Sequence, residues 1–87
     1  MHPSQWLSYP QQEESPLAPV AYTVFPGGRS RTRYFPLTSQ GLKEARNLAR
    51  LLSSSGVFCE VNIESSNERG RSRLQRHCLY FNGSLCS

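Results

Sequence analysis

The chain contains one segment with a clear helical pattern, residues 38–56. Its apolar side chains recur every three or four residues and so share one face: Leu42, Ala45, Leu48, Ala49 and Leu52. A basic stripe runs beside that face, made of Lys43, Arg46 and Arg50. Thr38 or Ser39 supplies the N-cap hydroxyl, and Gly56 is expected at the C′ position. Gly41 in the first turn should weaken the helix by ~1 kcal/mol relative to alanine.

Alternating apolar and polar residues after the helix predict two strands. In residues 57–64 the inward positions include Cys59, which we expect to be a core residue, while Glu60 and Glu64 point outward to pair with arginines on a neighbouring strand. In residues 73–81 one parity carries Leu74, Cys78 and Tyr80, with Arg76 as its misfit. Asn82-Gly83 predicts a turn after this second strand.

Residues 20–37 predict a β-hairpin around Pro26, Gly27 and Gly28, in one of two registers. A two-residue loop would mix apolar and charged groups on both faces. A three-residue loop over residues 27–29 would pair Val24 with Thr32 and Tyr22 with Tyr34. We favour the second register because it gathers arginines and aromatic rings on the outer face, namely Thr23, Phe25, Arg31, Arg33 and Phe35.

The N-terminal residues 1–19 are rich in proline and glutamine and predict an extended tail. Trp6 and Tyr9 in this tail are either incidental or anchors for a protein partner. Residues 20–87 predict a single α+β domain of ββαββ order. We expect an antiparallel sheet of about four strands with one helix packed on one face.

Composition narrows the range of functions. Lys and Arg total 10 against 6 Asp and Glu, and all ten basic residues, nine of them arginine, follow residue 20. Arginine suits phosphates and nucleobases. No apolar run approaches the ~20 residues that cross a bilayer, and no secretory signal opens the chain, so we expect a cytoplasmic protein without a membrane partner.

Candidate chemistry is sparse. The chain has no aspartate and two histidines, and no residue sits in a nucleophile motif, so we expect no catalytic residues and no cofactor. Cys59, His77, Cys78 and Cys86 are zinc-ligand types, but adjacent strand residues point apart and no Cys-x-x-Cys pair exists. We therefore expect no metal site.

Binding remains, and nucleic acid is the leading partner. Two arginine clusters, one on each hairpin, and the helix stripe supply cations, and rings are available for stacking. The candidate residues are Arg29, Arg31, Arg33, Phe35, Arg46, Arg50, Arg69, Arg71, Arg73 and Arg76. The alternative is a protein-binding inhibitor or adaptor that docks on an acidic surface or a larger nucleoprotein complex. An exposed edge strand would also permit a homodimer.

Two resemblances accompany these hypotheses. A helix on a short antiparallel sheet is similar to small phage and mobile-element accessory proteins, some of which are anti-CRISPR inhibitors. The strand-turn-strand-Thr-helix order of residues 22–52 resembles the DNA-binding arm at the N-terminus of tyrosine recombinases. The second resemblance implies DNA binding by the hairpin and helix, although this stretch has no fingerprint residue of that family.

Overall fold

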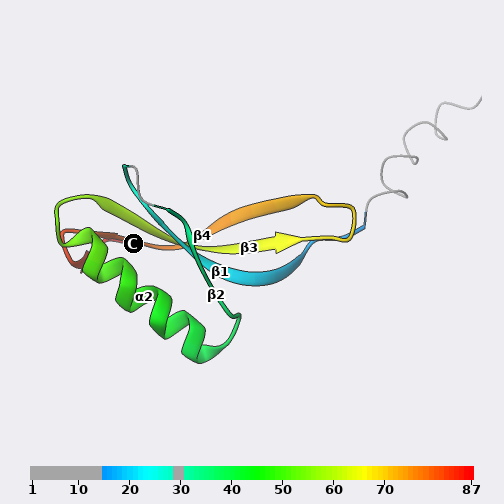
Figure 1. Cartoon of the computed structure of the whole chain (residues 1–87), viewed down its shortest axis with the longest axis horizontal. Coiled ribbons are helices and arrows are strands. Elements are labelled where there is room, and N and C mark those ends of the chain that lie inside the picture. The colour runs from blue at the N-terminus through cyan, green and yellow to red at the C-terminus, as the bar shows by residue number, and fades with distance from the viewer. Residues whose placement is uncertain (1–14, 29–30) are drawn as a thin grey trace, which may run out of the picture.

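A computed structural model describes residues 15–28 and 31–87, which form a five-stranded antiparallel sheet with one helix on one face (Figure 1). The elements are β1 (Ala18–Pro26), β2 (Arg33–Phe35), α2 (Ser39–Ser53), β3 (Phe58–Ser66), β4 (Ser72–Phe81) and β5 (Ser84–Leu85). The strand order is β2-β1-β3-β4-β5, so the two hairpins join through β1 and β3. The predicted α+β class is confirmed. The fifth strand forms because the chain reverses at Asn82 and Gly83, which both have positive φ, and Leu85 then pairs with Tyr80.

Helix α2 lies on the sheet through its small residues. Ala45 and Ala49 are fully buried, and Leu42, Leu48 and Leu52 pack around them, as the apolar pattern predicted. The Thr38 hydroxyl accepts a hydrogen bond from the Gly41 amide at 2.9 Å, which confirms the N-cap. At the other end the C-cap is Ser54, so Gly56, with φ of 92°, is the second residue beyond the cap rather than the C′ residue.

Gly41 has a structural role that helix propensity does not reveal. A Cβ atom at this position would lie 1.9 Å from the carbonyl oxygen of Pro36. No side chain fits there without moving the backbone that joins β2 to α2. The glycine therefore lets the helix begin directly after the edge strand and fold back over the sheet.

The register between β1 and β2 differs from the predicted one. Val24 pairs with Arg33, Thr23 with Tyr34, and Tyr22 with Phe35. The predicted three-residue loop over residues 27–29 is wrong because β1 stays paired with β3 as far as Gly27. Pro26 pairs with Cys59, and the Gly27 amide donates to the Phe58 carbonyl at 2.8 Å.

This shift of one residue exchanges the two sides of β2. Arg33 now shares the side of buried Val24, and Phe35 packs against the core instead of joining an outer face. Tyr34, which the predicted register turned inward, lies on the opposite side beside Thr23. The predicted outer face of Arg33, Phe35 and Phe25 is therefore not formed.

A bulge in β4 resolves the misfit at Arg76. Cys78 pairs with Val61, but the next pair is Arg76 with Asn62, which leaves His77 as the extra residue. Beyond the bulge, Arg76 and Leu74 lie on the side away from α2, so the predicted common face of Leu74 and Cys78 is wrong. Arg76 lies 3.7 Å from the carboxylate of Glu60, which confirms Glu60 as a cross-strand partner.

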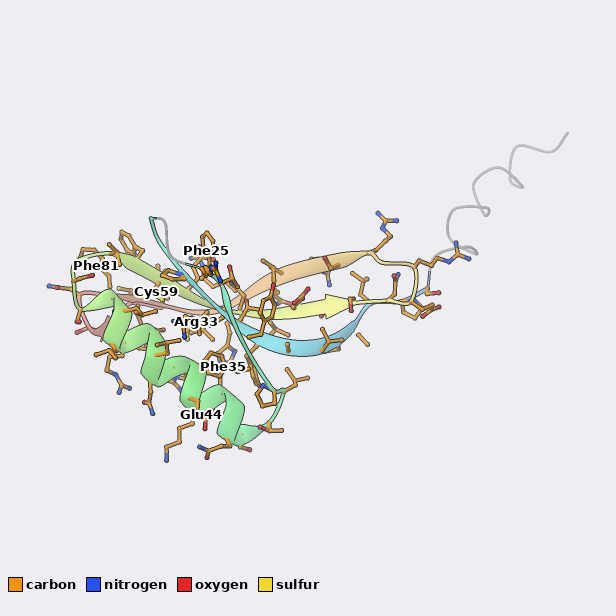
Figure 2. All side chains as sticks on the ribbon, viewed as in Figure 1. Phe25, Arg33, Phe35, Glu44, Cys59 and Phe81 are labelled. Atoms are coloured by element: carbon orange, nitrogen blue, oxygen red, sulfur yellow. The ribbon has the colours of Figure 1, made fainter. Side chains whose placement is uncertain are left out.

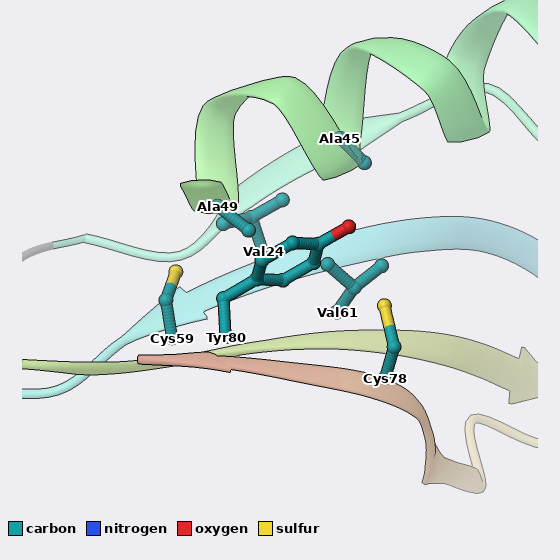
Figure 3. Packing of buried hydrophobic residues seen from close by; sticks show 7 residues of the cluster. All are labelled: Val24, Ala45, Ala49, Cys59, Val61, Cys78 and Tyr80. Carbon is teal, nitrogen blue, oxygen red and sulfur yellow. The ribbon is translucent and has the colours of Figure 1, made fainter. Parts of the chain in front are cut away.

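The core lies between α2 and the sheet. The ring of Tyr80 reaches from β4 toward α2 and packs with Val24, Val61 and the two helical alanines (Figure 3). Cys59 is fully buried there, and burial raises the pKa of its thiol to about 11, as a core thiol requires. In the described part of the chain, no helix is long and apolar enough to span a membrane.

The first strand begins within the predicted tail, at Ala18. Pro19 is tolerated because β2 covers β1 at residues 22–24 and leaves β1 as an edge strand near Pro19. The pairing with β3 is also irregular between Pro19 and Ala21. Trp6 and Tyr9, the predicted partner anchors, lie outside the described residues.

Candidate nucleic-acid interface

The two sides of the sheet have different surroundings. We call the side that carries α2 the helix side, and the opposite side the reverse face. The helix covers one end of the sheet, and the hairpin of β3 and β4 extends beyond it (Figure 1). The helix side therefore contains both a packed core and an uncovered stretch of strand next to it.

A hollow of about 780 Å³ lies beside α2 on the helix side. Its walls come from one flank of the helix, from the turn that precedes it and from β1. We call it the α2 groove. It is lined by Tyr22, Leu37, Thr38, Ser39, Leu42, Lys43, Arg46, Asn47 and Arg50.

A hydrogen bond to a core residue fixes the position of Arg46 in the groove. Its Nε donates a hydrogen bond of 2.9 Å to the hydroxyl of Tyr80, whose side chain is almost fully buried. This hydrogen bond raises the pKa of Arg46, so the guanidinium stays charged at any working pH. The contact orients the guanidinium before any ligand arrives and leaves its other N–H groups to donate.

Lys43 and Arg50 lie on the same flank, one helical turn to either side of Arg46. Arg50 donates to the Asn47 side-chain oxygen at 3.3 Å, and Glu44 accepts from Gln40 at 3.0 Å. Among residues 15–28 and 31–87, no carboxylate lies within ion-pair distance of these three cations. The groove thus concentrates positive charge that the described acidic residues do not neutralise.

Aromatic rings adjoin the cations. Tyr22 lines the groove, and its ring centroid lies 6.1 Å from that of His77 at an angle of 60°. His77 is exposed and, because of the β4 bulge, has no paired residue on β3. By register, Gln75 and Arg73 continue the helix side along β4, opposite Ile63 and Ser65.

The predicted binding residues are distributed over several surfaces. Arg46 and Arg50 meet in the α2 groove, whereas Arg76 lies on the reverse face. Arg69 and Arg71 belong to the loop between β3 and β4, where the Asn67 side chain accepts from both of their amides at 3.0 and 3.1 Å. Arg33 is exposed on β2, which forms one edge of the sheet, and Arg31 precedes this strand. Arg29 lies outside the described residues.

The predicted arginine clusters of the two hairpins do not lie together on one face of the sheet. Arg33 and Arg73 share the helix side by register, but β2 and β4 are separated by two strands. Of the residues that line the groove, Arg46 and Arg50 were in the predicted set, whereas Lys43 and Tyr22 were not. Lys43 belongs to the basic stripe that the sequence shows, whereas the place of Tyr22 in the groove depends on tertiary packing.

The two buried thiols are not among the residues that line the α2 groove. Cys59 and Cys78 are buried in the core, and burial raises the pKa of both. No cluster of three or more metal-ligand side chains exists within residues 15–28 and 31–87. What the arrangement can do is hold an anion with the cations of α2 and contact a flat apolar group with Tyr22.

No protein-family model, curated protein or solved structure matches this chain.

Proposed function

We propose that this protein is a non-enzymatic binding protein that holds nucleic acid in the α2 groove. The observation that carries the proposal is the row of Lys43, Arg46 and Arg50 beside Tyr22, with no described carboxylate in ion-pair distance. Cations on one flank of a helix bind successive phosphates, and an adjacent ring stacks with a base.

The surroundings of the groove support a chain-like ligand over a single small anion. The helix side continues from Tyr22 to Gln75 and Arg73 on the uncovered part of β4. A nucleic-acid strand that lies on Arg46 could follow this surface and reach a fourth cation. Cations spaced along a surface suit repeated phosphates, because each contact releases a condensed counterion.

The test compares two arginines that undergo the same chemical change. Arg50→Gln removes one charge from the groove, and Arg76→Gln removes one from the reverse face. Binding of labelled single-stranded and duplex DNA and RNA is measured by fluorescence anisotropy over a range of salt concentrations. We expect Arg50→Gln to weaken binding and to reduce the salt slope for a single strand by ~0.7. Arg76→Gln should leave both quantities unchanged.

Two results would contradict the proposal. The first is binding to nucleic acid that does not weaken with salt. The second is an equal loss for Arg50→Gln and Arg76→Gln, which would mean that net charge rather than the groove determines affinity.

A protein-binding inhibitor or adaptor is the second candidate. The specific observation is that Leu37 and Leu42 line the groove beside its cations, so an acidic protein segment with an apolar side chain would also fit. Purification of the tagged protein with and without nuclease separates the two functions. A partner protein retained after nuclease treatment supports the second candidate, while loss of all bound material supports the first.

A further inference from the structure

The reverse face carries half-exposed aromatic rings. Phe25 is 46% exposed and Phe58 is 54% exposed, and the Phe58 ring centroid lies 4.4 Å from that of Phe81. Figure 2 shows Phe25 and Phe81 on the side of the sheet away from α2. Within residues 15–28 and 31–87 the single helix packs on the other side, so none of these elements covers the rings.

Strand register makes the apolar positions contiguous. Phe58 pairs with Phe81, and Glu60 lies between Phe25 and Leu79 across three strands. Tyr34, 65% exposed, extends the surface to β2, because its partner Thr23 also points to the reverse face. The result is an apolar patch that crosses four adjacent strands.

Charge distinguishes this patch from the α2 groove. By register the reverse face carries the carboxylates of Glu60 and Glu64 and the guanidinium of Arg76. Arg76 and Glu60 lie 3.7 Å apart, so the centre of the patch is an ion pair. A face with these charges has little attraction for nucleic acid and instead suits a surface that is apolar and self-complementary.

We propose that the reverse face is the interface at which two copies of this chain pack, sheet against sheet. The central ion pair is the reason to choose a second copy as the occupant. A two-fold axis that passes between Glu60 and Arg76 places Glu60 of one copy opposite Arg76 of the second copy, and the reciprocal pair forms at the same time. The rings of the two copies then surround two cross-copy ion pairs.

The size of the patch is consistent with a stable dimer. A half-exposed aromatic side chain presents about 100 Å². Phe25, Phe58, Tyr34 and the exposed Leu74 therefore contribute roughly 400 Å² in each copy, before Leu79, Phe81 and the polar rim are added. Two such faces supply roughly 800 Å², and burial of these additional residues brings the total toward the ~1,200 Å² at which specific interfaces begin. The dimer leaves both α2 grooves on its outer sides, and it forms whether or not those grooves bind nucleic acid.

The first test measures the mass of the full chain by sedimentation velocity over a concentration series. We expect a species of twice 9.9 kDa. Phe58→Asp should give the 9.9 kDa monomer at concentrations where the unchanged protein is dimeric. Leu51→Asp is the matched control, because Leu51 is 68% exposed on α2 and should leave the dimer intact. Circular dichroism verifies that each variant is folded.

The second test examines the two-fold arrangement. Glu60→Arg alone and Arg76→Glu alone each place like charges across the interface, so each should weaken the dimer. An equimolar mixture restores both ion pairs and should form a heterodimer. A chain that remains monomeric at every concentration overturns the proposal, as does a dimer that survives Phe58→Asp. A mixture no more dimeric than its components overturns the arrangement about the two-fold axis.

Discussion

The helix side and the reverse face of the sheet are built from the same strands but are held in different ways. On the helix side, fully buried residues such as Val24, Val61 and Tyr80 contact α2, and a hydrogen bond positions Arg46. On the reverse face the ion pair of Glu60 and Arg76 is solvent-exposed, and the rings are half exposed. We therefore expect substitutions on the helix side to change folding or groove binding, and those on the reverse face to change assembly.

The two surfaces depend closely on each other. Alternate residues of one strand belong to opposite sides, so a shift of one residue transfers a side chain from one side to the other. The β4 bulge moves Arg76 away from the helix side, and the β1/β2 register moves Arg33 toward it. The β4 bulge and the β1/β2 register thus decide which cations lie on the same side of the sheet as the groove.

The largest effect is expected at the junction of β2 and α2. Gly41→Ala adds a methyl group where a Cβ would lie 1.9 Å from the Pro36 oxygen, and should destabilise the fold by about 3 kcal/mol. Helix propensity alone would give a gain of ~1 kcal/mol, the opposite sign. Urea unfolding followed by circular dichroism measures the difference. Gln40→Ala, an exposed neighbour in the same turn, is the control, and a Gly41→Ala protein as stable as this control would contradict the close approach.

The second effect concerns pH and the buried thiol of Cys59. Burial raises the thiol pKa from 9.0 to about 11, so the folded state retains a proton that the unfolded state loses in this range. The stabilisation is complete below pH 9 and is lost as the pH rises toward 11, by about 2 kcal/mol. Unfolding free energies of the unchanged protein and of Cys59→Ala, compared at each pH, isolate this contribution.

Cys86→Ala is the control for the thiol, because Cys86 is exposed and its removal should not alter the pH dependence. If Cys59→Ala and the unchanged protein lose stability in parallel between pH 9 and 11, the Cys59 thiol is not the cause.

The smallest expected effect is a change in nucleic-acid affinity that depends on the groove and not on the reverse face. Tyr80→Phe removes the acceptor for Arg46 while keeping the charge, so affinity for nucleic acid should fall roughly three- to tenfold with an unchanged salt slope. Tyr34→Phe makes the same change on the reverse face and should not alter affinity. Anisotropy titrations measure both. Equal affinities for the two variants would show that the hydrogen bond to Tyr80 does not orient Arg46 for binding.

Patterns within single elements predicted much of this fold. The helix, its Thr38 cap, its alanine face and the buried position of Cys59 all follow from local spacing, because period and burial are linked in one element. The same holds for the turn at Asn82-Gly83, although the two-residue strand after it is too short to show a pattern. The basic flank of α2 was also visible in the sequence, and it supplies the cations of the groove.

Relations between elements depended on tertiary structure. A strand pattern of period two looks the same after a shift of one residue, so the sequence left open which face Arg33 and Phe35 occupy. The answer depends on β1 continuing along β3 at Pro26 and Gly27, a contact between residues far apart in the chain. The bulge at His77 and the approach of Pro36 to Gly41 are likewise set by packing, because each arises where two backbones meet and neither backbone specifies it alone.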